Sequence, residues 1–584
     1  MKRILALVMS MMLILTAAGG AAAWADEAPE DCADTVYVNA RFYTEDESNP
    51  DAEAMAVKDG VIIYIGTADT EELAALTGEK TEVIDLQGAF VTPNIIDAHS
   101  HPGIVCTTSW YTDMPEECCT VESILDFVAS YCDEHPADEE PYIYFEYYPS
   151  DLFDENGPRK EWIDEVVSDR AILIEDFSDH ACWVNTRFLE LIGAYTEGVI
   201  APEDEEFLIK DETGDYTGWI KEFVWQNYIG NLYDALNYYP PEYVTEETIS
   251  PVLDDFKSWG ITGVFDACIL DEEHVATISQ MDKDGVLNMY YELGWKMDTY
   301  DDLEDSIDII HYLNDTYGTD HVSIDTLKIF YDGTNELGDA ALVDGWINDP
   351  SQTGYLLMTE EETADVIRRC NEEGIDVHFH MVGDLAFRQV CNAVETVLDE
   401  LGSLNIQVEL CHCEYINPED YERPAQLGIL VNWTPHWSGG YFGDGSLQYL
   451  GEERYNNMYQ FNPLIDSGAV VTFGSDIYSM YEENRANPYF GMQTAMTRVD
   501  IEYPLETDGG MRQSEEAKLS LEDLLKGYTI NAAVQMRIDD VTGSLTVGKY
   551  ANFNIYGVNL FDVDEFEFLN VLPEAVYFEG NRIA

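Results

Sequence analysis

The sequence predicts an α/β protein: a (β/α)8 TIM-like barrel with a large insertion after its first strand, and a small β-sandwich domain built from both termini. Three observations support this class. Short apolar segments alternate with helical patterns through the middle of the chain, alternating strands occupy both ends, and one gap between apolar segments is far longer than the others. With 584 residues, 46% of them hydrophobic, the chain can form several packed units.

The N-terminus has the pattern of a cleaved signal peptide over residues 1–25. Lys2 and Arg3 precede an apolar stretch at 4–18, and Ala23-Trp24-Ala25 matches a small-residue cleavage site. A retained membrane anchor is the alternative, but the apolar stretch is shorter than the about 20 residues that cross a bilayer. We therefore expect a secreted protein that has no membrane attachment after cleavage.

Strand patterns at both ends predict one composite β domain from residues 33–92 and 540–584. Segments 54–57 and 61–66 flank Asp59-Gly60, a dipeptide typical of a tight hairpin turn. Segments 551–556 and 575–580 show the same alternation near the C-terminus. We expect these two ends to pack together beside the barrel.

The barrel is predicted over residues 93–535, from short apolar strands separated by helical patterns such as 360–373 and 386–401. The expected strands are 95–98, 263–267, 287–293, 327–331, 376–380, 407–412, 429–433 and 469–474. The gap after the first strand, about residues 106–258, must hold an insertion, which is rich in tyrosine and acidic residues.

The formal net charge is −87, from 28 Lys+Arg and 115 Asp+Glu. So acidic a surface repels phosphate backbones, which excludes nucleic acid as a partner and disfavours anionic lipid. Solubility or adaptation to salt accounts for the charge. We expect a small-molecule substrate that is neutral or cationic, and leave a homo-oligomer open. The 11 cysteines allow disulfides in an oxidising compartment, but the sequence does not reveal their pairing.

Residues that can bind a metal lie on the predicted barrel strands. His99 and His101 end the first strand, and histidines two residues apart on a strand point to the same face. Later strands add Lys328 in the fourth, His380 at the end of the fifth, His412 at the end of the sixth and Asp476 after the eighth. Barrel enzymes build their sites at the carboxyl ends of the strands, and imidazole with carboxylate suits Zn²⁺. The sequence therefore predicts a divalent metal site.

A series of motifs resembles a known family. The first strand reads P-x-x-I-D-x-H-x-H from Pro93 to His101, and the fourth reads K-x-x-x-D-G from Lys328 to Gly333. Further motifs are G-I-T-x-V-x-D at 260–266, H-x-x-G-D at 380–384, G-S-D at 474–476 and G-S-L-x-x-G-K-x-A-N at 543–552. Over nearly the whole mature chain, the sequence is similar to the metal-dependent amidohydrolase superfamily, and within it to amidohydrolase family 3, which includes N-substituted formamide deformylases.

The resemblance implies one or two divalent metals, expected to be zinc. The implied ligands are His99, His101 and Asp476 for one ion, His380 and His412 for the other, and a carboxylated Lys328 as the bridge between them. An unmodified lysine cation would be repelled by such a site. The alternative for Lys328 is an ion pair with Asp332 or another carboxylate at the barrel rim.

The resemblance also implies roles in catalysis. The metal lowers the pKa of a bound water so that hydroxide forms near neutrality, and Asp476 passes the proton of that water to the departing nitrogen. His180 and His436 each follow an apolar strand and are expected to contact the substrate carbonyl or the oxyanion.

The sequence departs from the family pattern at three places: Asn94 replaces Gly, Gly338-Asp339-Ala340 replaces Arg-Thr-Ala, and Cys411-His412-Cys413 replaces Glu-His-Ala. Because Cys411 and Cys413 flank His412 on a strand, we expect their side chains to face the surrounding helices, away from the metal. His378, one pleat behind His380, is expected to lie behind the ligands rather than among them.

Together these features predict an exported metal-dependent hydrolase. It would cleave a non-peptide carbon–nitrogen bond in an amide, a formamide or another N-acyl small molecule. A mononuclear deaminase on the same barrel is the alternative among enzymes. A ligand-binding barrel without turnover is the alternative outside them, although such a protein has no physical reason to retain six residues of ligand type.

Overall fold

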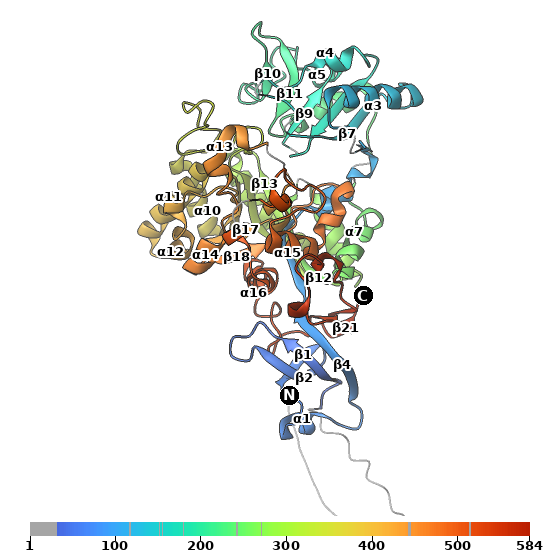
Figure 1. The fold of residues 1–584 in the computed structure, drawn as a ribbon, viewed down its shortest axis with the longest axis vertical. Coiled ribbons are helices and arrows are strands. Elements are labelled where there is room, and N and C mark those ends of the chain that lie inside the picture. The colour runs from blue at the N-terminus through green and yellow to red at the C-terminus, as the bar shows by residue number, and fades with distance from the viewer. Residues whose placement is uncertain are drawn as a thin grey trace, which may run out of the picture.

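The computed structural model describes residues 32–584 except 116–117, 151, 155, 179, 241–242, 270, 442–444 and 513–514. The predicted signal peptide at residues 1–25 lies outside the described residues. Figure 1 shows three stacked parts: the insertion at the top, the barrel in the middle, and a β domain containing β1, β2 and β4 at the bottom. Within the described ranges, no helix is both long and apolar enough to cross a membrane.

Eight parallel strands form the barrel, and they follow one another in the sheet in chain order, which confirms the predicted architecture. The first and last strands meet at their carboxyl ends, where the backbone N–H of Asp476 donates to the carbonyl of His99 at 2.8 Å. The barrel is therefore nearly closed. Its strands are β5 (Ile95–Ser100), β12 (Ile261–Ile269), β13 (Tyr290–Met297), β14 (Val322–Phe330), β15 (Asp376–Met381), β16 (Val408–His412), β17 (Leu430–Trp433) and β18 (Val470–Phe473).

Amphipathic helices cover the outside of the barrel. In α10 (Glu360–Glu373), Thr359 and Glu362 form a capping box at the start, and Gly374 ends the helix with a φ of 75°. Ile367 on its buried face joins strand residues in one apolar cluster. The other helices of this part are α7 (Glu246–Ser258), α8 (Glu272–Lys283), α9 (Leu303–Tyr317), α11 (Asp384–Leu401), α12 (Arg423–Leu427), α13 (Leu447–Tyr455), α14 (Asn462–Ser467), α15 (Pro488–Thr497), α16 (Leu521–Lys526) and α17 (Ala532–Gln535).

The insertion folds around a six-stranded mixed sheet of its own, in the order β10-β11-β9-β8-β7-β6. Apolar clusters on both faces give it separate cores, one around Phe188 and Trp225 and the other around Ile124 and Trp183. Its elements are β6 (Thr112–Asp113), α3 (Val121–Glu134), β7 (Tyr142–Tyr148), α4 (Lys160–Asp164), β8 (Ala171–Asp176), β9 (Ala181–Val184), α5 (Thr186–Ile192), β10 (Leu208–Lys210), β11 (Tyr216–Lys221) and α6 (Gln226–Leu236). The short helix α2 (Pro102–Val105) precedes the insertion and packs against α7 and β12 of the barrel.

Strands from both ends of the chain form the β domain, as predicted. They make one seven-stranded sheet in the order β21-β20-β19-β4-β1-β2-β3, which curls so that Ile62 exchanges hydrogen bonds with the segment before β19. Asp59 and Gly60 both have positive φ, as the predicted hairpin turn requires. The elements are β1 (Thr35–Tyr43), β2 (Asp51–Lys58), β3 (Val61–Gly66), α1 (Glu71–Leu76), β4 (Glu82–Pro93), β19 (Phe553–Tyr556), β20 (Ala575–Phe578) and β21 (Asn581–Arg582).

Asn94 joins the β domain to the barrel. Its Nδ2 donates to Thr262 Oγ1 at 2.9 Å and to the carbonyl of Tyr577 at 2.7 Å. The asparagine that replaces the usual glycine therefore connects the first two barrel strands with β20, far from the carboxyl ends of the strands where the predicted ligands lie.

Candidate active site

Asp476 is the centre of a cluster of ligand-type side chains at the carboxyl ends of the barrel strands. Its Oδ1 lies 2.9 Å from His101 Nε2 and 3.2 Å from His99 Nε2, and its Oδ2 lies 3.3 Å from His412 Nδ1. The ring of His380 lies 4.5 Å from that of His412, measured between centroids. The structure thus gathers the predicted ligands from β5, β15, β16 and the segment after β18.

Hydrogen bonds between the first and last strands position Asp476. Ser475 donates to Asp97 from its backbone N–H at 2.9 Å and from Oγ at 2.6 Å. A Cβ on Gly474 would lie 2.5 Å from the backbone N of His99, so only glycine permits this close approach. The G-S-D motif and the Asp of the first motif therefore close the barrel and aim the Asp476 carboxylate at the histidines.

Cys411 faces the barrel interior, and our prediction that it faces the helices is wrong. Its Sγ lies within 4.8 Å of ring nitrogens of His99 and His378. Strand alternation fails here because His412 has a φ of 69°, in the left-handed region. The side chains of Cys411 and His412, which are neighbours in the chain, therefore both point inward. Cys413 does lie in the apolar core around the barrel, as expected.

Lys328 is fully buried on β14, inside the barrel. Its Nζ donates to Cys411 Sγ at 3.6 Å and lies 4.8 Å from the ring centroid of Phe330. Among the described residues no carboxylate forms an ion pair with it. Asp332 instead accepts three backbone N–H groups, from residues 341, 382 and 383, at 2.8–2.9 Å. These bonds attach the segment after β14 to the end of β15, where His380 lies.

The protonation states of this cluster suit a divalent metal. Burial lowers the pKa of His99 to about 3 and the pKa values of His380 and His412 well below the usual range, so the rings are neutral. Burial alone would raise the pKa of Asp476, but the surrounding histidines hold it well below its usual value. His380 Nε2 is buried without a hydrogen-bond partner among the described residues. Neutral imidazoles and an ionised carboxylate are the forms that bind metals, so the donor set fits.

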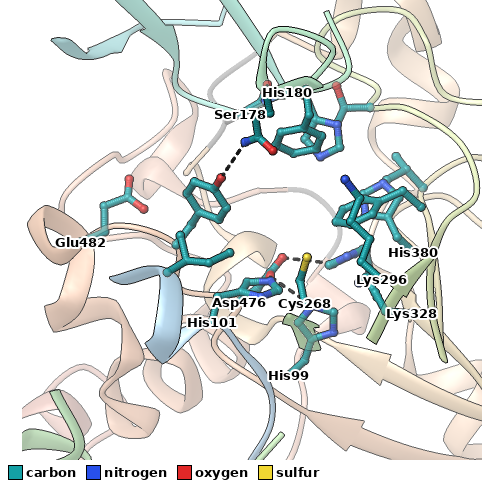
Figure 2. Close-up of a pocket in the computed structure, with 18 of the residues that line it drawn as sticks. His99, His101, Ser178, His180, Cys268, Lys296, Lys328, His380, Asp476 and Glu482 are labelled. Carbon is teal, nitrogen blue, oxygen red and sulfur yellow. Dashed lines mark hydrogen bonds and ion pairs between the residues drawn. The ribbon is translucent and has the colours of Figure 1, made fainter. Parts of the chain in front are cut away.

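A cavity of about 300 Å³ opens above the cluster. Figure 2 shows Ser178 and His180 on the side of this cavity opposite His99 and His101, with Lys296, Lys328 and His380 on a third side. The barrel supplies the wall that carries the ligand-type residues. The insertion supplies a largely aromatic wall, which includes Tyr111, Tyr144, Phe223, Trp225, Ile229 and Tyr233.

His180 lies in this cavity, where the sequence placed it, and it has a partner that sequence reasoning missed. Its Nδ1 lies 2.9 Å from Glu222 Oε2, and its ring lies 5.1 Å from that of His380. Burial raises the pKa of Glu222, and the nearby His180 opposes that shift. The pairing leaves His180 Nε2 as the nitrogen that can contact a ligand. Glu222 directly follows β11, but the insertion is rich in acidic residues, and nothing in the sequence distinguishes Glu222 from the others.

His436 does not line the cavity, and the geometry does not support its predicted contact with the substrate. Its Nδ1 lies 3.3 Å from Arg485 Nη1, which can only donate, and its Nε2 donates to the carbonyl of Ser475 at 2.9 Å. Burial, together with Arg485, lowers the pKa of His436 to about 3. Both ring nitrogens are occupied, so His436 supports the G-S-D segment instead.

The fold and the site define a metal-dependent barrel hydrolase. The chain belongs to the Amidohydrolase family, whose model matches residues 82–584. It is therefore a hydrolase that acts on carbon–nitrogen bonds, and the resemblance read from the motifs is confirmed.

Similar proteins cover most of the chain. The sequence is 26% identical over 456 residues to the exoenzymes regulatory protein AepA of Pectobacterium carotovorum subsp. carotovorum, covering 75% of this chain and 93% of that protein. It is 24% identical over 546 residues to an N-substituted formamide deformylase of Arthrobacter pascens, covering 89% and 92%. A solved structure of a metal-dependent hydrolase from Pyrococcus horikoshii OT3 shares the fold, with a TM-score of 0.63, 19% identity and coverage of 94% and 100%.

Proposed function

We propose that the protein hydrolyses the amide bond of a small N-acyl or N-formyl compound. One observation carries this proposal: the cluster of ligand-type residues around Asp476 and the ring of His180, which is paired with Glu222, line the same cavity. A carbonyl group placed between them would contact both. Similarity to an N-substituted formamide deformylase supports this substrate class.

The centre would hold zinc through His99, His101, His380, His412 and Asp476, with a carboxylated Lys328 as the bridge between two ions. The buried position of Lys328 supports the carboxylation, because a buried ammonium group without a carboxylate partner is costly. Carboxylation replaces that cation with an anion. The N–H that remains on Nζ can still donate to Cys411 Sγ.

The metal, when bound, supplies Lewis acidity that lowers the pKa of water and polarises a carbonyl. Asp476, ionised at neutral pH, accepts a proton from the attacking water and returns it to the departing nitrogen as the C–N bond breaks. The products are a carboxylic acid and an amine. When both nitrogens of His180 carry hydrogen, Nδ1–H donates to Glu222 and Nε2–H can donate to the carbonyl oxygen as negative charge develops on it.

The charges of the cavity favour a neutral or cationic substrate. Glu336, Glu414 and Glu482 line the cavity beside Asp476. Burial raises the pKa of all three glutamic acids, so the negative charge of the cavity lies mainly on Asp476. Lys296 also lines it, but its Nζ pairs with Asp298 at 3.0 Å. An anionic substrate would meet the ionised Asp476 and, with Lys328 carboxylated, no free ammonium group among the described lining residues. The overall charge of −87 repels polyanions at longer range.

The test is a panel of N-formyl, N-acetyl and larger N-acyl compounds, assayed with protein reconstituted with Zn²⁺ and with chelator-treated protein. We expect amine release that requires the metal. Ammonia release from amino-substituted heterocycles, without amide cleavage, would instead establish the deaminase. Stoichiometric metal without turnover of any compound would favour a binding protein.

We also propose that the protein is exported, which the pattern of residues 1–25 supports. N-terminal sequencing of protein collected from the culture medium of the producing cells tests this. A mature chain that begins at Asp26 is expected. Full-length protein that retains Met1 and stays inside the cells would contradict export.

A further inference from the structure

A chain of three buried polar groups leads from the ligand cluster toward the base of the barrel. His99 Nδ1 lies 2.8 Å from His378 Nε2, and His378 Nδ1 lies 2.6 Å from Glu409 Oε2. Both histidines are 0% exposed and Glu409 is 2% exposed, so water does not compete for these bonds. We call His99, His378 and Glu409 the relay.

Strand register explains how the relay forms. His378 pairs with Lys328 on β14 and with Glu409 on β16, which places the three residues at one level of the parallel sheet. His378 and His380 are two residues apart on β15, so both face the interior. One histidine reaches the cavity, and the other lies one layer below it, against His99.

Only one arrangement of hydrogens in the relay leaves a lone pair on His99 Nε2, the nitrogen that lies 3.2 Å from Asp476. In that arrangement His99 Nδ1–H donates to His378 Nε2, and His378 Nδ1–H donates to Glu409. The reverse arrangement would put hydrogen on His99 Nε2, and a protonated nitrogen cannot bind a metal. The relay thus couples the orientation and the tautomer of His99 to a buried carboxylate.

We propose that His378 and Glu409 are positioning residues that hold His99 in its metal-binding tautomer. The inference rests on the proposed metal-binding role of His99. The relay distinguishes His99 from His101, whose Nδ1 has no hydrogen-bond partner within the described part of the chain. Partners that orient a metal-binding histidine commonly change metal affinity by about 10- to 100-fold when removed.

The first test compares His378→Leu with His378→Gln in the full-length protein. Leucine removes both hydrogen bonds, whereas the amide of glutamine can accept from His99 and donate to Glu409. We expect His378→Leu to weaken Zn²⁺ binding about 10- to 100-fold, as measured against a competing chelator, and His378→Gln to restore most of the affinity. The visible spectrum of the Co²⁺-loaded protein should change in the leucine variant and resemble wild type in the glutamine variant.

A second pair of variants keeps the test decisive if His378→Leu does not fold. Glu409→Leu removes the acceptor at the end of the relay, and Glu292→Leu removes a nearby buried carboxyl group that accepts from Thr326 Oγ1 at 2.6 Å. We expect weaker Zn²⁺ binding, by about 10-fold, only in Glu409→Leu.

Two results would overturn the relay: wild-type affinity in His378→Leu, or equal losses in Glu409→Leu and Glu292→Leu. A wild-type protein that binds no Zn²⁺ would instead overturn the proposed metal centre itself. The two failures are therefore distinguishable.

Discussion

The barrel wall and the insertion wall of the cavity are built in different ways. The barrel wall carries buried ligand-type side chains whose places are set by strand register and by bonds between neighbouring strands, such as Ser475 to Asp97. The insertion wall is largely aromatic, stands on a separate six-stranded sheet, and contributes the His180–Glu222 pair. We therefore propose that the barrel wall binds the metal and that the insertion wall provides much of the substrate contact.

Removing the first-strand ligands should have the largest effect. In His99→Asn/His101→Asn we expect loss of bound metal and a fall in activity of roughly 1,000-fold or more, since the metal contributes several kcal/mol and each 1.4 kcal/mol is a factor of ten. Elemental analysis and the amide assay measure both effects. The exposed His311, replaced by Asn, is the control. Stoichiometric metal in the double variant would refute the assignment.

Lys328→Ala tests the buried lysine of the barrel wall. We expect loss of the second metal and a fall in activity of about 100-fold, since one Lewis acid and the bridging anion are removed together. Short-chain carboxylic acids should restore part of both. Lys296→Ala, at a lysine of the same cavity that pairs with Asp298, should keep its metal. Two metals and normal turnover in Lys328→Ala would contradict the bridging role of Lys328.

His180→Ala tests the insertion wall. We expect kcat/KM to fall by roughly 10- to 1,000-fold with the metal content unchanged, the range expected when one polarising contact is lost. His436→Gln is the comparison: its amide can still donate to the Ser475 carbonyl, so turnover should stay within about threefold of wild type. Wild-type kinetics in His180→Ala would contradict a catalytic role for the insertion wall.

The smallest expected effect lies outside both walls. His321 contacts Asp282 at 2.7 Å and Glu579 at 3.1 Å, joining the barrel to the β domain, and these carboxylates raise its pKa to about 9. A raised pKa in the folded state stabilises the protein fully below the unfolded pKa of about 6.5, and this stabilisation is lost as the pH rises through about 9. His321→Gln should therefore lower Tm by about 2 °C at pH 6, and not at pH 10.

Thermal unfolding followed by circular dichroism across that pH range measures the difference. Zn²⁺ affinity and turnover at pH 7 should not change in His321→Gln. If the Tm difference between wild type and His321→Gln is constant with pH, protonation of His321 does not stabilise the contact between the barrel and the β domain.

The sequence by itself determined the barrel, the composite β domain and the strand positions of the ligand-type residues. It could do so because the strands are continuous apolar runs, and because parallel strands carry residues at their carboxyl ends to one rim. Once the register is set, His99, His380 and Asp476 must lie near one another. The barrel part of the site was therefore predictable from local patterns.

Only the tertiary structure decided which neighbours those residues meet. The left-handed backbone at His412 turns the His412 side chain inward beside Cys411, and no periodicity predicts such a departure. The partners Glu222 of His180 and Glu409 of His378 are 42 and 31 residues away along the chain, and the occupied nitrogens of His436 depend on Arg485, 49 residues on. Hydrogen-bonding partners depend on distances between elements, and those distances exist only after the elements pack.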